Sequence, residues 1–145
     1  ERDALVPLVE RLGNRVVAVG MLPRSEYLAL LHRADIVVSA ARNEFFGIAV
    51  VEAIAAGAVP VLPDRLAYPE VVPARFHEHV LYADGQLAAA LGGTIESLAA
   101  TRAAVDGLAD SMHRFDWTEV APGYDAAVDR LAHPPRPPVG APAAG

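Results

Sequence analysis

Apolar residues along the chain occur either as short continuous runs or at helical spacing. The continuous runs at 16–19, 36–39, 59–62 and 80–82 are typical of strands that are covered on both faces. Between these runs, apolar residues recur three or four positions apart, as they do from Tyr27 to Ala34, which predicts amphipathic helices. Strands that alternate with helices over short connections predict an α/β fold, a Rossmann-like parallel sheet with helices on both faces.

Glycine, proline and capping residues place the ends of the expected helices. By residue number, these helices are 5–12, 23–34, 48–56, 86–91, 94–112 and 117–131. We expect Ser25 to cap the second helix and Gly57 to end the third. Asp116 and Glu119 resemble a capping box at the start of the last helix, where Trp117 is expected to anchor the helix in the core.

Composition limits the classes of function. The 145 residues are 53% apolar and carry a net charge of −6, so this chain by itself lacks the positive surface of a nucleic-acid binder. It contains no Cys, which excludes disulfides and thiolate metal sites. The cluster His77-Glu78-His79 has no evident third ligand, so we expect no metal site. No apolar run is long enough for a membrane span and no signal peptide is recognisable, so we expect a cytoplasmic protein.

The chain divides into a domain over 1–132 and a tail over 133–145. The tail holds five prolines without apolar periodicity, and we expect it to be disordered or polyproline-like. Because the chain begins at Glu1 rather than at Met, we expect the domain to be part of a longer protein.

The stretch from Asn43 to Pro63 carries the candidate chemistry. It places two carboxylates, Glu44 and Glu52, in a strongly apolar segment, where each needs a compensating donor. Gly47 allows a tight turn just before a helix whose first-turn amides, those of Ile48 and Ala49, would favour an anion such as a pyrophosphate. Carboxylates also accept hydrogen bonds from vicinal hydroxyls. A site with amides for a diphosphate and carboxylates for the sugars on either side of it matches the parts of a nucleotide-sugar.

Three pieces of this stretch resemble the donor-site motif of retaining GT-B glycosyltransferases of the group 1 class: Glu44-Phe45-Phe46-Gly47, Glu52-Ala53 and Gly57-Ala58-Val59-Pro60-Val61. The usual form in that class is Glu-Gly-Phe-Gly, then Glu-Ala, then Gly-x-Pro-Val. The similarity extends over roughly residues 16–131. It implies that the chain is a partial C-terminal half of a GT-B fold.

Departures from the usual form point to a subgroup. Phe45 replaces the common Gly, and Leu66-Ala67-Tyr68-Pro69-Glu70 stands where the class has Gly-Gly before a Glu. Together with the late Phe115-Asp116-Trp117, these features are similar to the queuosine-tRNA mannosyltransferases, which use GDP-mannose.

The resemblance implies a role for each matching residue. Glu44 would contact hydroxyls of the donor sugar as the catalytic carboxylate, and Glu52 would bind the nucleotide ribose. Backbone amides of Phe46, Gly47, Ile48 and Ala49 would hold the sugar and the phosphates. Further candidates are Arg42, chosen by proximity, and the Tyr68–Glu70 segment; Glu70 stands at the position of a family Glu, in an altered context. Retaining enzymes of this kind need no metal, so neither a metal nor another cofactor is expected.

Several alternatives stay open from the sequence. The donor could be a UDP- or ADP-sugar and the acceptor a glycan, a lipid or a small molecule. The chain could also be a non-catalytic nucleotide-binding module or a purely structural α/β domain. If the chain is part of a GT-B enzyme, we expect its partner to be the acceptor-binding N-terminal half of the same protein, which would also make any contact with tRNA. We then expect the chain by itself not to turn over substrate.

Overall fold

The computed structural model describes residues 2–133 of the chain. Its sheet has three parallel strands in the order β1–β2–β3, formed by β1 (Ile36–Val38), β2 (Val59–Pro63) and β3 (Leu81–Tyr82). In the register, Ile36 lies opposite Val59, and Leu62 lies opposite Leu81. A parallel sheet joined by helical crossovers confirms the predicted Rossmann-like α/β class.

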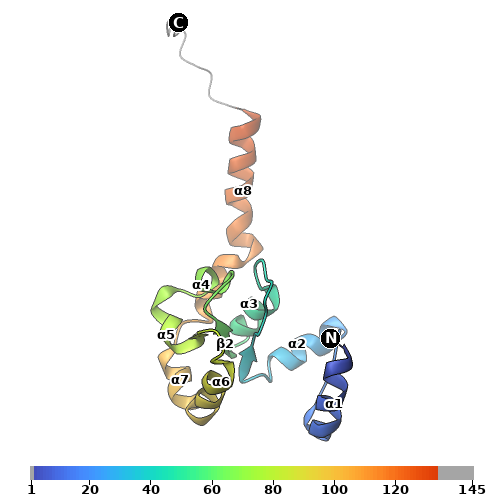
Figure 1. Ribbon diagram of the computed structural model, residues 1–145. Coiled ribbons are helices and arrows are strands. Elements are labelled where there is room, and N and C mark those ends of the chain that lie inside the picture. The colour runs from blue at the N-terminus through green and yellow to red at the C-terminus, as the bar shows by residue number, and fades with distance from the viewer. Residues whose placement is uncertain (1, 134–145) are drawn as a thin grey trace, which may run out of the picture.

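Helices surround this sheet (Figure 1). Helix α3 contacts β1 and β2, while α5, α6 and α7 contact β2. The helices, with 3₁₀ turns marked η, are α1 (Arg2–Leu12), η1 (Gly13–Arg15), α2 (Arg24–Leu31), α3 (Ile48–Ala55), α4 (Tyr68–Val71), η2 (Ala74–Phe76), α5 (His77–Val80), α6 (Leu87–Glu96), α7 (Leu98–Ala104), η3 (Asp110–Phe115) and α8 (Trp117–Ala132).

The hydrophobic core lies around the central strand. Val59 and Leu62 of β2 are almost completely buried and pack with Ile54 of α3. Leu108 and Met112, next to and within η3, are each 2% exposed and close the same core. Burial at this level contributes about 1.5–3 kcal/mol for each large aliphatic side chain, so η3 is firmly attached to the sheet.

The expected strand over 16–19 is wrong. These residues follow η1 as an extended segment that belongs to no strand in the described structure, and Val17 and Val19 are 69% and 60% exposed. Figure 1 shows α1 set apart from the sheet. The apolar pattern indicated a strand, but a strand needs a partner with free backbone groups, and 16–19 pairs with no strand among residues 2–133.

The long helix expected over 94–112 is also wrong. Helix α6 ends at Glu96 and α7 begins at Leu98, while Gly107, with φ +77°, separates α7 from η3. Left-handed backbone at Gly107 cannot continue a helix. Of the apolar side chains in this range, Val105 and Leu108 are buried, whereas Ile95 is 60% exposed.

The predicted caps are only partly confirmed. Gly57, with φ +97°, follows the end of α3 as expected. Helix α2 begins at Arg24 with Pro23 as its N-cap, so Ser25 lies inside the helix and does not cap it. Asp116 is the N-cap of α8, but its carboxylate makes no capping hydrogen bond, because its Oδ2 lies 2.9 Å from Nδ1 of His113.

Helix α8 extends away from the sheet (Figure 1). Trp117, in its first turn, is 73% exposed and stacks on Tyr124 with ring centroids 6.2 Å apart. Trp117 is therefore not the core anchor that we expected. Within residues 2–133 no helix is both long and apolar enough to cross a membrane. Apart from His133, the tail lies outside the described residues.

Candidate functional site

Three loops meet where the parallel strands end. The segment 39–47 follows β1, the segment 64–67 follows β2, and the segment 83–86 follows β3. All three strands run in the same direction, so these loops share one edge of the sheet. In open α/β sheets, ligands bind at this edge.

Glu44 is held by the backbone of its own loop. Its Oε1 accepts hydrogen bonds from the amides of Phe45 at 3.0 Å, Phe46 at 3.3 Å and Gly47 at 3.0 Å. Three successive N–H groups that converge on one anionic oxygen form a backbone nest. The nest fixes Glu44 at the start of α3 and leaves Oε2 without a hydrogen bond among the described residues.

Gly47 makes this turn possible. Its φ of +85° and ψ of +45° are left-handed, and it is the N-cap of α3. Its carbonyl accepts the amides of Val50 and Val51 at 2.9 and 3.0 Å, which starts the helix. The amides of Ile48 and Ala49 precede these bonds and have no acceptor in the described part of the chain. They are the first-turn donors that the sequence placed here.

Glu52 lies one turn farther along α3 and is paired with α2. Its Oε2 accepts a 2.7 Å hydrogen bond from the hydroxyl of Tyr27, and its Oε1 lies 2.9 Å from Nη2 of Arg24. These bonds, first from Arg24 and then from Tyr27, lower the pKa of Glu52. Burial raises the pKa of Tyr27, and its hydrogen bond to the carboxylate raises it further. Glu52 therefore stays ionised, and its side chain is still 29% exposed to a ligand.

Tyr68 lies against the turn that holds Glu44. The residue is 1% exposed, and its hydroxyl lies 2.7 Å from Oγ of Ser39. A Cβ placed on Gly47 would lie 3.2 Å from Cε1 of Tyr68, so the ring packs directly on the glycine. Of the candidate segment, the structure brings the Tyr68 side chain to the loop, whereas Glu70 is exposed at the far end of α4.

Arg42 lines a cleft at the same sheet edge. The cleft has a volume of about 540 Å³, and its walls are formed by Ala40, Arg42, Arg65, Tyr82, Asp84, Gly85 and Leu87. Arg65 pairs with Asp84, and its Nη2 donates to the carbonyl of Ala41 at 3.0 Å. Among the described residues, no set of three His, Cys, Asp or Glu side chains could hold a metal ion.

Sequence reasoning missed the partners of these residues. Tyr27 was named only as the start of an apolar stripe, and Arg24 fell within the expected helix 23–34 without a role of its own. Neither gives a local signal, because each lies far from Glu52 in the sequence and reaches it only when α2 packs beside α3. Arg65 was missed for the same reason.

Known proteins share much of this sequence. A family model described as "Glycosyl transferases group 1" matches residues 7–106. The tRNA-queuosine alpha-mannosyltransferase of Drosophila melanogaster is 48% identical over 64 residues, which is 44% of this chain and 17% of that protein. The GDP-mannose:cellobiosyl-diphosphopolyprenol alpha-mannosyltransferase of Xanthomonas oryzae pv. oryzae (strain PXO99A) is 42% identical over 65 residues, with the same two shares. The match thus covers well under two thirds of either relative.

Proposed function

Because this chain belongs to the group 1 glycosyl transferases, we propose that it is the donor-binding part of a retaining mannosyltransferase that uses GDP-mannose. Its acceptor in this proposal is queuosine in tRNA. One observation carries the proposal: a turn that fixes Glu44 immediately precedes a helix whose free first-turn amides and Glu52 lie on the ligand-binding edge of the sheet. The names of the two mannosyltransferase relatives support the choice of sugar.

Each group in the site has a role in this proposal. Oε2 of Glu44 accepts hydrogen bonds from hydroxyls of the mannose, and the Glu52 carboxylate accepts them from the ribose. The Ile48 and Ala49 amides bind the diphosphate directly. The Phe46 and Gly47 amides act through Glu44, because they already donate to its Oε1. Arg42, which lines the cleft at the same sheet edge, contacts the acceptor or the phosphates. Glu70 has no contact in this proposal, because it is exposed at the far end of α4.

The chemical demand of the transfer fits these donors. The anomeric carbon exchanges its bond to a diphosphate oxygen for a bond to an acceptor hydroxyl oxygen, whose proton leaves toward the diphosphate. Negative charge therefore grows on the diphosphate in the transition state. Fixed amides and the amino end of α3 stabilise that charge without rearranging. No step in this scheme needs a metal.

Donor specificity is tested by calorimetry on the 145-residue chain. We expect GDP-mannose to bind more tightly than UDP-glucose or ADP-glucose, and Glu52→Gln to weaken all three, because it removes the anionic acceptor for the ribose. Glu96→Gln, which makes the same change at an exposed position at the end of α6, serves as the matched control. Tighter binding of a UDP- or ADP-sugar would replace the mannosyl proposal, and no binding of any nucleotide-sugar would contradict the donor site.

The acceptor has a second candidate. The Xanthomonas relative is named for a diphosphopolyprenol-linked acceptor, so a lipid-linked glycan is the alternative to tRNA. The test joins this chain to an acceptor-binding half and supplies labelled mannose as GDP-mannose. Label found in queuosine-containing tRNA supports the first acceptor, and label found in a polyprenol diphosphate glycan supports the second. We expect the 145-residue chain by itself to transfer no sugar to either acceptor. Measurable transfer would contradict the hypothesis that the chain holds only the donor-binding part of the active site.

A further inference from the structure

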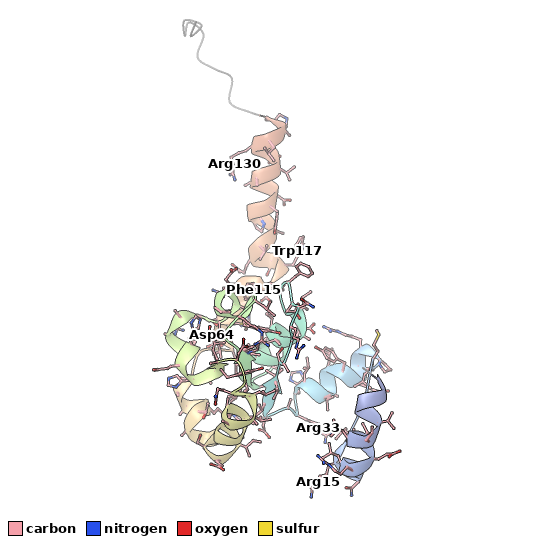
Figure 2. All side chains as sticks on the ribbon, in the orientation of Figure 1. Arg15, Arg33, Asp64, Phe115, Trp117 and Arg130 are labelled. Atoms are coloured by element: carbon pink, nitrogen blue, oxygen red, sulfur yellow. The ribbon has the colours of Figure 1, made fainter. Side chains whose placement is uncertain are left out.

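The loop that carries Glu44 rests on a residue from the other end of the chain. The ring of Phe46 meets the ring of Phe115 edge to face, with centroids 5.0 Å apart and planes at 83°. Figure 2 shows Phe115 where α8 joins the body of the molecule. Phe115 lies outside residues 7–106, which match the family model. The contact is therefore not accounted for by the family part of the chain.

Phe115 sits on a firm support. It is the last residue of η3, and it packs against the core that contains Met112 and Leu108. Its neighbour Arg114 donates from Nη2 to the carbonyl oxygens of Glu70 at 2.9 Å and Val71 at 2.7 Å. The same guanidinium lies 4.6 Å from the centre of the Phe115 ring. These bonds attach η3 to the last turn of α4.

Helix α4 supports the loop from a second side. Its first residue, Tyr68, packs on Gly47, and the Tyr68 hydroxyl bonds to Ser39 at the start of the same loop. Two aromatic side chains, Tyr68 and Phe115, thus contact the loop from two elements that Arg114 joins. The amides of Phe46 and Gly47, which bond to Glu44, lie at these two contacts.

We propose that Phe115 is a positioning residue for donor recognition. Through the ring of Phe46 it holds the amides of residues 45–47 on Oε1 of Glu44, and so fixes the direction in which Oε2 meets the sugar. This inference rests on the proposed function of Glu44. The competing explanation is that Phe115 contributes only to the stability of the core.

Amide hydrogen exchange tests the contact without any ligand. In Phe115→Ala we expect the Gly47 amide to exchange about three- to tenfold faster, the range that corresponds to the loss of an aromatic pair. The Ala56 amide, which bonds to the carbonyl of Glu52 at the other end of α3, is the internal control. Phe115→Tyr keeps the ring and should restore slow exchange. Equal exchange at Gly47 in Phe115→Ala and the unsubstituted chain would overturn the proposal.

Donor binding separates positioning from stability. Calorimetry with GDP-mannose is run on the unsubstituted chain, Phe46→Ala, Phe115→Ala and the double variant. Positioning through Phe46 predicts that Phe115→Ala weakens binding about three- to tenfold, but has little further effect once Phe46 is Ala. Additive losses would overturn it. Val80→Ala, in α5, destabilises the same core without touching η3, and should leave the affinity of the folded chain unchanged.

Two outcomes require a further variant or a separate conclusion: Phe115→Ala that does not fold, and an unsubstituted chain that binds no GDP-mannose. If Phe115→Ala does not fold, Phe115→Leu replaces it, because leucine keeps an apolar side chain but removes the ring edge. If the unsubstituted chain binds no GDP-mannose, the proposed donor site fails. The exchange experiment still decides whether Phe115 positions the loop.

Discussion

The hydroxyl of Tyr27 in α2 donates a hydrogen bond of 2.7 Å to Oε2 of Glu52 in α3, where Arg24 engages the other carboxylate oxygen. Both oxygens of Glu52 are thus already oriented before a ligand arrives. Each oxygen retains a second lone pair, so the carboxylate can accept from a ribose while it keeps its protein partners. Helix α2 therefore takes part in the site through Glu52.

Tyr27→Phe is expected to weaken GDP binding about three- to tenfold, equivalent to roughly 1 kcal/mol, because Glu52 loses one of the two groups that orient it. Isothermal titration calorimetry measures the change. Leu28→Ala, one residue along α2 and without a bond to Glu52, is the control. Unchanged affinity in Tyr27→Phe would mean that Glu52 needs no support from α2.

The lowered pKa of Glu52 predicts how stability depends on pH. Its unfolded value is near 4.5, and in the folded chain the bonds from Arg24 and Tyr27 hold it lower. Its contribution is thus fully present above that unfolded pKa and is lost as the pH falls through the folded pKa. We expect the difference in unfolding free energy between the unsubstituted chain and Glu52→Gln to stay constant above about pH 5 and to shrink below it. Urea denaturation at several pH values checks this, and a difference independent of pH would contradict it.

Gly47→Ala is expected to destabilise the chain by about 1–2 kcal/mol, because alanine disfavours left-handed backbone. It should also weaken nucleotide-sugar binding, since the added methyl group would press on the Tyr68 ring at 3.2 Å. Thermal unfolding and calorimetry measure the two effects.

Gly57→Ala is the matched control for this change. Gly57 is also left-handed, with φ +97°, but a Cβ there would meet nothing within 4 Å. It should lower stability by a similar amount and leave the binding of donor unchanged. If Gly57→Ala lost as much donor affinity as Gly47→Ala, the loss would have to come from backbone strain in α3 and not from the Gly47 turn.

The single tryptophan reports on the start of α8. Since Trp117 is 73% exposed, we expect its fluorescence to have the emission of a solvent-exposed indole and to be quenched readily by iodide. Trp117→Ala should change the unfolding free energy by no more than about 0.5 kcal/mol, as for other surface positions. A shielded emission spectrum would indicate that a partner surface covers this residue.

The local features of the site could be predicted from the sequence. Gly47 and Gly57 marked the two ends of α3, because left-handed backbone is nearly restricted to glycine. The apolar runs gave β1, β2 and β3, since buried parallel strands read as continuous apolar residues. The order of these elements also predicted that Glu44 follows the end of a strand, which is where the structure has it.

Features that depend on distant parts of the chain could not be predicted. The run at 16–19 has the composition of a strand, but whether it pairs is decided by its neighbours. The bonds that Arg114 makes to α4 and the contact of Phe115 with Phe46 join segments far apart in sequence. The sequence marked Tyr68 only as a candidate site residue. Its role in supporting the Gly47 turn became visible only from the packing of its ring on Gly47.

The nest around Glu44 has a consequence for anions in solution. Oε1 of Glu44 already accepts hydrogen bonds from the amides of residues 45–47. Because Glu44 is tethered to these amides, it competes for them at an effective concentration of about millimolar or more. Free sulfate or phosphate is therefore a weak competitor at these amides. We therefore expect the loop to favour, over a small inorganic anion, a larger ligand that gains further contacts at Ile48 or Glu52.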